Sequence, residues 1–215
     1  PDAGAGGDAY TAEAGPPYAD GDWLFESDRL LRFEVEIPQA DWDTLRNQER
    51  NCLDIFGESC GTEPAPSAFT YFSATLTVEG ETFTNVGIRK KGFLGSLNST
   101  KPSLKIKMNE YVLGQTMSGL KRFTLNNSVQ DPSYVNQCVG YDLFRAAGIP
   151  APRCNFATVS VNGEELGVYV HVEAVKKPFL RMHFGSDTGN LYEGTLSDFR
   201  DGWTGTFDKK TNETV

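Results

Sequence analysis

The sequence lacks any apolar run near the ~18 residues that a membrane-spanning helix needs. It contains only two histidines, His171 and His183, and none of its four cysteines has CxxC spacing. Because zinc sites are built from closely spaced cysteines and histidines, we expect no zinc site. The 215 residues, of which 39% are hydrophobic, are sufficient for one domain with its own core or for a small two-lobed domain.

Basic residues are missing from the first 28 positions. Residues 1–28 carry seven acids and no Lys or Arg, whereas the whole chain has 29 acids, 20 bases and a net charge of -9. Residues 29–215 are therefore close to neutral. The Gly, Ala and Pro content of residues 1–28 predicts a disordered acidic tether, of the kind that follows an export signal or a lipid anchor. The alternative is a remnant of cloning.

The four cysteines suggest two disulfides. Cys52 and Cys60 bracket a short loop with one glycine between them, and Cys138 and Cys154 flank a predicted helix and the strand after it. We expect disulfides within each pair, which would suit an exported protein. Four reduced thiols in a cytosolic protein remain the alternative, because connectivity cannot be derived from sequence.

Hydrophobic periodicity predicts a mixed fold. Alternation predicts strands at 30–37, 69–78, 82–91, 104–108, 122–125, 155–161 and 167–172, with a further short strand at 190–193. Helical spacing predicts helices at 39–48, 134–144 and 176–184. The order predicts an α+β fold: a mainly antiparallel sheet with an inserted long helix, and then the start of a second lobe.

A cationic stretch lies in this acidic protein. Residues 86–108 hold six bases, and no acid occurs between Glu81 and Glu110; the bases are Arg89, Lys90, Lys91, Lys101, Lys105 and Lys107. A loop with Gly92, Gly95 and Ser96 joins its two strands and would let backbone N–H groups approach an anion. The pattern favours a phosphate or carboxylate ligand. The alternative is a solvated sheet face.

Seven segments, in order from about Phe33 to Thr195, resemble the spore-coat CotH kinase family: FEVEIPQADWDTL, NVGIRKKG, KPSLKIKM, LKRFTLNNSVQDPSYV, AAGIPAPRCNF, VNGEELGVYVHVEAV with FLRMHF, and GNLYEGT. The resemblance implies a secreted or surface-associated protein with an atypical protein-kinase-like fold, and the acidic tether would also suit a lipid-anchored form. It also implies ATP and Mg²⁺ as cofactors, and transfer of the γ-phosphate to Ser or Thr of a surface or coat protein.

Matched to the family, this chain would bind the nucleotide through Arg89, Lys91, Gly92, Ser96, Lys101, Lys105 and Glu173. Lys105 would hold the phosphates, and Glu173 would lie at the connection between the lobes. Glu193 stands where the family commonly has a lysine after GNLY.

The family's catalytic and metal-binding aspartates lie beyond GNLY, so we expect them beyond Val215. Asp198, Asp201 and Asp208 lack the surroundings of a catalytic base or metal ligand. Residues 29–215 are thus expected to be a truncated, inactive CotH-like domain that needs its C-terminal part, on the same or a separate chain.

The alternative is a non-catalytic surface module that binds a protein or an anionic polymer. Nucleic acid is a poor candidate partner, because the sequence pI is about 4.8 and the bases form no extended stripe.

Overall fold

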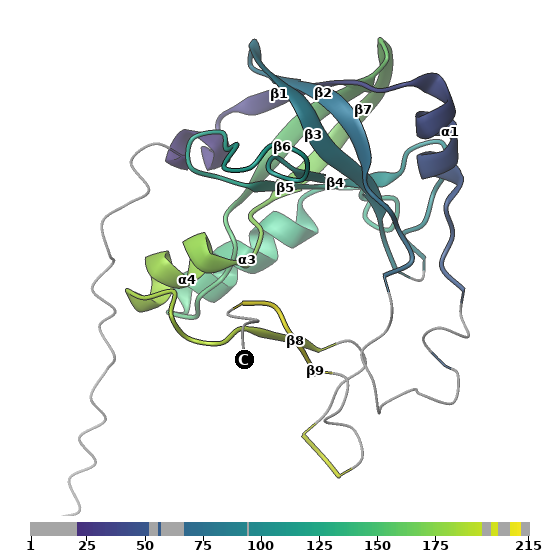
Figure 1. Cartoon of the computed structure of the whole chain (residues 1–215). Helices are drawn as coiled ribbons and strands as arrows, with labels where there is room; N and C mark the ends of the chain where they lie inside the picture. Colours follow the sequence, from purple (N-terminus) through teal and green to yellow (C-terminus); the bar gives the residue numbers. More distant parts are fainter. Residues whose placement is uncertain are drawn as a thin grey trace, which may run out of the picture.

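Seven strands of the computed structural model form a closed barrel (Figure 1). The structure describes residues 21–51, 56, 67–93, 95–194, 199–201 and 207–211. The barrel order is β1-β2-β3-β4-β5-β7-β6. The strands are β1 (Leu30–Glu36), β2 (Phe72–Val78), β3 (Glu81–Lys91), β4 (Ser103–Lys107), β5 (Arg122–Asn126), β6 (Cys154–Val161) and β7 (Glu164–Val172).

The other described elements lie around the barrel (Figure 1). They are the 3-10 helix η1 (Asp22–Phe25), the helices α1 (Gln39–Asn47), α3 (Asn136–Ala146) and α4 (Lys177–Phe184), and the separate ribbon β8 (Tyr192–Gly194) with β9 (Phe207–Lys209). The helices η1 and α1 lie at the two ends of β1, while α3, α4 and the ribbon lie below the barrel in the view of Figure 1.

Side chains at alternate positions along the strands fill the barrel. In β1, Leu31, Phe33 and Val35 are buried and the residues between them point outward. Neighbouring strands alternate in the same way, so that the interior is packed with side chains. Its largest members include Phe33, Phe123, Tyr169, Leu76, Ile88, Leu104 and Ile106.

The predicted α+β, protein-kinase-like fold is wrong. The strands and hairpins were placed well, but β1 pairs in parallel with β6, with Phe33 opposite Val159, and this pairing closes a mostly β, mixed barrel. Local sequence patterns contain no signal for a pairing between segments this far apart. The inserted helix is also short, because α3 has 11 residues and spans about 16 Å.

Part of the predicted acidic tether packs on the barrel. Residues 1–20 lie outside the described residues, but Leu24 and Phe25 of η1 are buried in the main core. Trp42 and Leu45, three residues apart on α1, join the same core, as their helical spacing predicts.

The predicted Cys138–Cys154 disulfide is confirmed, whereas Cys52 and Cys60 lie outside the described residues. Cys138 is the buried residue of α3, and Leu143 and Phe144 on the same helix are exposed. Cys138 and the partly buried Tyr141 pack α3 against a small cluster with Val170 and Val172 of β7, and the disulfide ties the helix to β6.

Replacing Cys138 and Cys154 together with serine is expected to lower the free energy of unfolding by about 3 kcal/mol, the entropic value for a loop of this length. The sequence separation of the two cysteines is 16 residues. Urea denaturation of the parent and the double variant measures the change. A loss of less than about 0.5 kcal/mol, the range of ordinary surface substitutions, would show that the disulfide does not hold α3.

Candidate anion-binding site

The basic residues of β3 point to opposite sides of the barrel wall. Lys90 is 2% exposed, and its Nζ donates hydrogen bonds of 2.7 Å and 2.8 Å to the carbonyl oxygens of Arg46 and Gln48. These carbonyls lie at the C-terminal end of α1, where a cation is favourable. Burial lowers the pKa of Lys90. Lys90 therefore fixes α1 on the barrel, and Arg89 and Lys91 are left on the outer face.

The ammonium group of Lys101 is bound by other residues of the fold. Its Nζ donates to the hydroxyl of Tyr134 at 2.8 Å and to the carbonyl oxygen of Val168 at 2.7 Å. The same nitrogen lies 4.8 Å and 5.0 Å from the ring centroids of Tyr134 and Tyr169. These contacts join the segment before β4 to β7, so Lys101 serves the fold.

The glycine and serine loop is folded tightly on its neighbours. The Ser96 hydroxyl accepts a hydrogen bond from the Phe93 N–H at 2.9 Å and donates to the Phe93 carbonyl at 3.0 Å. Gly95 has φ +80°, and a Cβ there would lie 2.3 Å from Nε2 of Gln130. Gly92 has φ +148°, also favourable only for glycine. The predicted residues Gly92 and Ser96 shape this loop.

Three cations lie close together on the outer faces of β3, β4 and β5, and a fourth, just before α4, lies near them. Arg89 pairs with Lys105 across the β3–β4 ladder, and Arg122 lies two residues before Thr124, the partner of Lys105 on β5. Lys176, just before α4, adds a further positive charge near Lys105. With Lys91 we call this set the cationic cluster: Arg89, Lys91, Lys105, Arg122 and Lys176.

Burial and the neighbouring positive charges of the cluster lower the pKa of Lys105. Burial lowers the pKa of Lys105 to about 8, and the charges of Arg89, Arg122 and Lys176 act in the same direction. Glu193 on β8 acts in the opposite direction. Desolvation and neighbouring positive charge both disfavour the ammonium form. An anion placed here would therefore relieve unfavourable charge interactions.

Lys91 forms the edge of the cluster that faces α3. Burial lowers its pKa to about 8, with a further contribution from Arg89. Its Nζ donates to Oδ1 of Asn126, whose Nδ2 donates to Oε1 of Gln137 at 2.7 Å. The network fixes the position of the Lys91 ammonium group.

A pocket of about 540 Å³ adjoins the cluster, because Arg122 and Lys176 belong to both. Apolar lining comes from Phe25, Leu120 and Pro178. We call it the cationic pocket because its lining includes six basic residues: Lys121, Arg122, Lys176, Lys177, Arg181 and Lys210.

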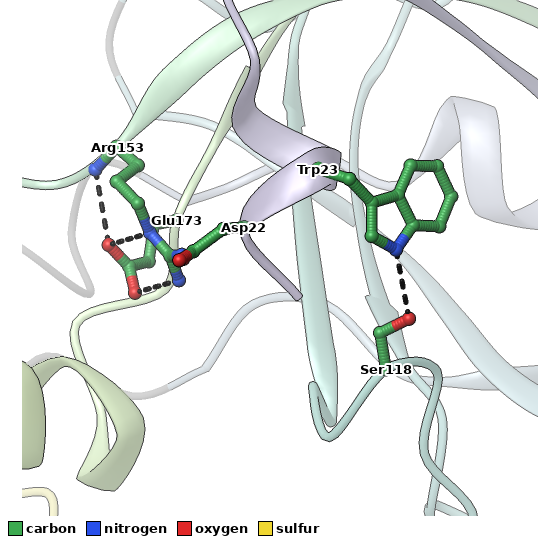
Figure 2. Close-up of polar contacts among 5 residues, drawn as sticks. All are labelled: Asp22, Trp23, Ser118, Arg153 and Glu173. Atoms are coloured by element: carbon green, nitrogen blue, oxygen red, sulfur yellow. Dashed lines mark hydrogen bonds and ion pairs between the residues drawn. The ribbon is translucent and has the colours of Figure 1, made fainter. Parts of the chain in front are cut away.

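The acid among the described lining residues, Glu173, is neutralised by Arg153 (Figure 2). Glu173 is 4% exposed and accepts hydrogen bonds from Nη2, Nε and the backbone N–H of Arg153 at 2.8 Å, 3.1 Å and 3.1 Å. Asp22 binds the same guanidinium group, which lies 4.4 Å from the ring centroid of Phe25. The carboxylate predicted to contact a nucleotide is thus engaged within the fold.

The described residues do not provide a metal site. They contain no group of three or more His, Cys, Asp or Glu side chains arranged to hold an ion. Asp208 pairs with Lys210, Asp201 is exposed, and Asp198 lies outside the described residues. The Mg²⁺ that the family resemblance implies therefore has no identified ligands here.

Of the predicted site residues, Arg89, Lys91 and Lys105 come together in the cluster. Sequence reasoning missed Arg122 and Lys176. The signal for Arg122 was present, since alternation within the predicted strand at 122–125 places it on the same face as Thr124. Lys176 is distant in sequence from these strands, and only the folded structure brings it to the site.

In the part of the chain that the structure describes, we find no helix with the length and apolar character needed to cross a membrane.

Comparison with known proteins identifies the family of this chain. The model of the CotH kinase protein family matches residues 88–214, more than half of the chain. Inner spore coat protein H of Bacillus subtilis (strain 168) is 33% identical over 78 residues, which cover 36% of this chain and 22% of that protein. The match thus spans about a fifth of the curated relative. From the extent of the family match, the chain belongs to the CotH kinase protein family.

Proposed function

We propose that this chain forms the nucleotide-phosphate-binding part of a CotH-type protein kinase that transfers the γ-phosphate of ATP to Ser or Thr of a surface or coat protein. The observation that carries the proposal is the position of Lys105 among Arg89, Arg122 and Lys176. Phosphate groups are commonly bound by Lys and Arg, and protein kinases place a phosphate-binding lysine on a strand.

The other lysines of residues 86–108 are less suited to this role. Lys90 and Lys101 donate to protein oxygens, and Lys107 forms an ion pair with Glu110 at 2.5 Å. Glu193 is the counter-charge that acts on Lys105 among the described residues, and its side chain is largely exposed. A polyphosphate would supply the negative charge that the cluster lacks.

The proposal includes an extracellular or cell-surface location. The curated relative is by name a spore coat protein, and the Cys138–Cys154 disulfide suits an oxidising compartment. Bound Mg²⁺ would neutralise phosphate charge in such a reaction. Since the described residues form no metal site, we assign them no step that involves the ion.

Affinity for an ATP analogue is expected to fall as the pH rises through about 8. Lys105 has its pKa lowered to about 8 in the free protein, and a bound phosphate would favour its ammonium form. Binding above this pH therefore requires proton uptake, and each further pH unit should lower the affinity by up to about ten-fold. Calorimetry from pH 7 to 9.5 measures the trend. An unchanged affinity across the range would contradict the role of Lys105.

A second candidate is a non-catalytic module that binds carboxylate-rich protein or polymer. The six bases of the cationic pocket favour it, because Lys and Arg also bind carboxylates. A competition binding experiment with the ATP analogue distinguishes the two candidate functions. Polyglutamate should displace the ATP analogue only weakly if the site is built for phosphates, and at least as well as triphosphate if the module binds acidic polymers.

A further inference from the structure

The helix α3 and the residues just before it contact two bases beside the candidate anion-binding site. Gln137 on α3 accepts a hydrogen bond from Nδ2 of Asn126 at 2.7 Å, and Oδ1 of Asn126 accepts one from Nζ of Lys91. Just before α3, the hydroxyl of Tyr134 accepts a hydrogen bond of 2.8 Å from Nζ of Lys101. The bases at the start and at the end of the glycine and serine loop thus both contact this part of the chain.

The hydrogen bonds that run from α3 to Lys91 have one consistent direction. A lysine ammonium group can only donate, so the amide oxygen of Asn126 must face Lys91 and its amide nitrogen must face Gln137. The other end of Gln137 is fixed too, because its Nε2 donates to the hydroxyl of Tyr141 at 3.1 Å. The neutral amide of Asn126 uses one of the three ammonium donors without cancelling the charge. Gln137 therefore orients Lys91 through Asn126 and leaves its charge for an anion.

A disulfide fixes α3 at the residue that follows Gln137. Cys138 is the buried residue of this helix, and its sulfur is bonded to that of Cys154 at the start of β6. Large apolar side chains of α3 are exposed, namely Val139, Leu143 and Phe144. The covalent link thus lies next to the residue that orients Asn126, on a helix whose outer apolar face has no cover among the described residues.

The disulfide can be reached from solvent. Cys138 and Cys154 are each 8% exposed, and both line a second pocket of about 380 Å³. The exposed side chains of Val135 and Val139 line the same pocket, so it opens to the outside. Exchange requires that a thiolate reaches one sulfur of the disulfide. A pocket of this size admits a small thiol.

We propose that the Cys138–Cys154 disulfide regulates anion binding through Gln137. While the disulfide is closed, α3 keeps Gln137 against Asn126, and Lys91 is held in place. A dithiol that opens it gives up two electrons and two protons and becomes a disulfide itself, and the protein is left with two thiols. The helix then loses its covalent link to β6, and Lys91 loses its fixed position. The inference rests on the anion-binding part of the proposed function and not on phosphoryl transfer.

The test measures the affinity for inorganic tripolyphosphate by calorimetry, with and without dithiothreitol, an uncharged dithiol that does not compete for a cationic site. Three variants are compared with the parent. The first carries C138S and C154S, and the second carries Gln137→Met, which keeps the disulfide and removes the contact with Asn126. The matched control carries C52S and C60S, so that any effect of reducing the other two cysteines is separated. Mass mapping shows which disulfides are open, and circular dichroism shows that each variant is folded.

Reduction should weaken the binding of tripolyphosphate by the parent and by the matched control several-fold, up to the roughly ten-fold value of one charge-assisted contact. The variant without Cys138 and Cys154 should bind as weakly as the reduced parent and should not respond to dithiothreitol. Gln137→Met should also bind weakly and should not respond, although its disulfide opens.

Two results would overturn the inference while leaving the phosphate site intact. One is an unchanged affinity of the parent in dithiothreitol, whether its Cys138–Cys154 disulfide opens or stays closed. The other is a Gln137→Met variant that binds like the oxidised parent, or that still loses affinity on reduction, because the disulfide would then not act through Gln137. Failure of the oxidised parent to bind tripolyphosphate at all would contradict the proposed function as well.

Discussion

Replacing Glu173 with alanine is expected to lower the free energy of unfolding by about 3–5 kcal/mol, the usual cost of removing one partner of a buried ion pair. Glu173 is 4% exposed and accepts three hydrogen bonds from Arg153. Without it, the Arg153 guanidinium would remain in a largely buried position without the carboxylate that accepts hydrogen bonds from its Nε and Nη2. Urea denaturation measures the loss.

Glu193→Ala is the matched control for this change. Glu193 also faces a base, with its Oε2 3.5 Å from Nζ of Lys210, but its side chain is largely exposed. Its removal should cost less than about 1 kcal/mol. A similarly small loss for Glu173→Ala would mean that the fold does not need this carboxylate, and that Glu173 is available to a ligand.

Replacing Lys105 with methionine is expected to weaken the binding of an ATP analogue about ten-fold or more, which corresponds to about 1.5–3 kcal/mol for a lost charge-assisted hydrogen bond. The same change should not destabilise the fold. Lys105 has like-charged neighbours and a pKa lowered to about 8, so its charged form raises the energy of the folded state.

The effect of Lys105→Met on the stability of the fold should depend on pH. A lysine whose pKa is lowered on folding destabilises the protein fully below about pH 8, and less as the pH rises toward the unfolded value of about 10.4. The stability of Lys105→Met relative to the parent should therefore be greatest near neutral pH and decline above pH 8.

Lys107→Met is the matched control for binding. Lys107 lies two residues further along β4 on the same outer face, but it is ion-paired with Glu110. Its loss should change the affinity for the ATP analogue far less than that of Lys105. Equal effects of the two substitutions would show that only the overall positive charge matters, and no change with either would remove Lys105 from the site.

Local patterns predicted most elements of this fold, and the reasons for the failures are physical. Alternation identified β1 and the hairpin of β6 and β7, because each signal lies within a few residues. Barrel closure depends on the parallel β1–β6 pairing, which no turn or short spacing encodes. The kinase-like fold inferred from the resemblance was wrong for the same reason, since the matching segments do not specify how the strands pair.

The site was predictable to a similar degree. Residue type and alternation singled out Arg89, Lys91 and Lys105. They did not reveal that Lys90 points inward to α1, or that Lys101 is enclosed by Tyr134 and Tyr169. The residues that oppose these side chains come from distant segments, so their contacts appear only in the folded chain.

A crystal structure of the chain with a non-hydrolysable ATP analogue and Mg²⁺ would test whether Lys105 binds nucleotide phosphates. We expect phosphate density on the outer faces of β3, β4 and β5, with a phosphate oxygen within hydrogen-bond distance of Lys105 Nζ and contacts to Arg89 or Arg122. A bound nucleotide whose phosphates lie elsewhere, with Lys105 contacting none of them, would contradict this expectation.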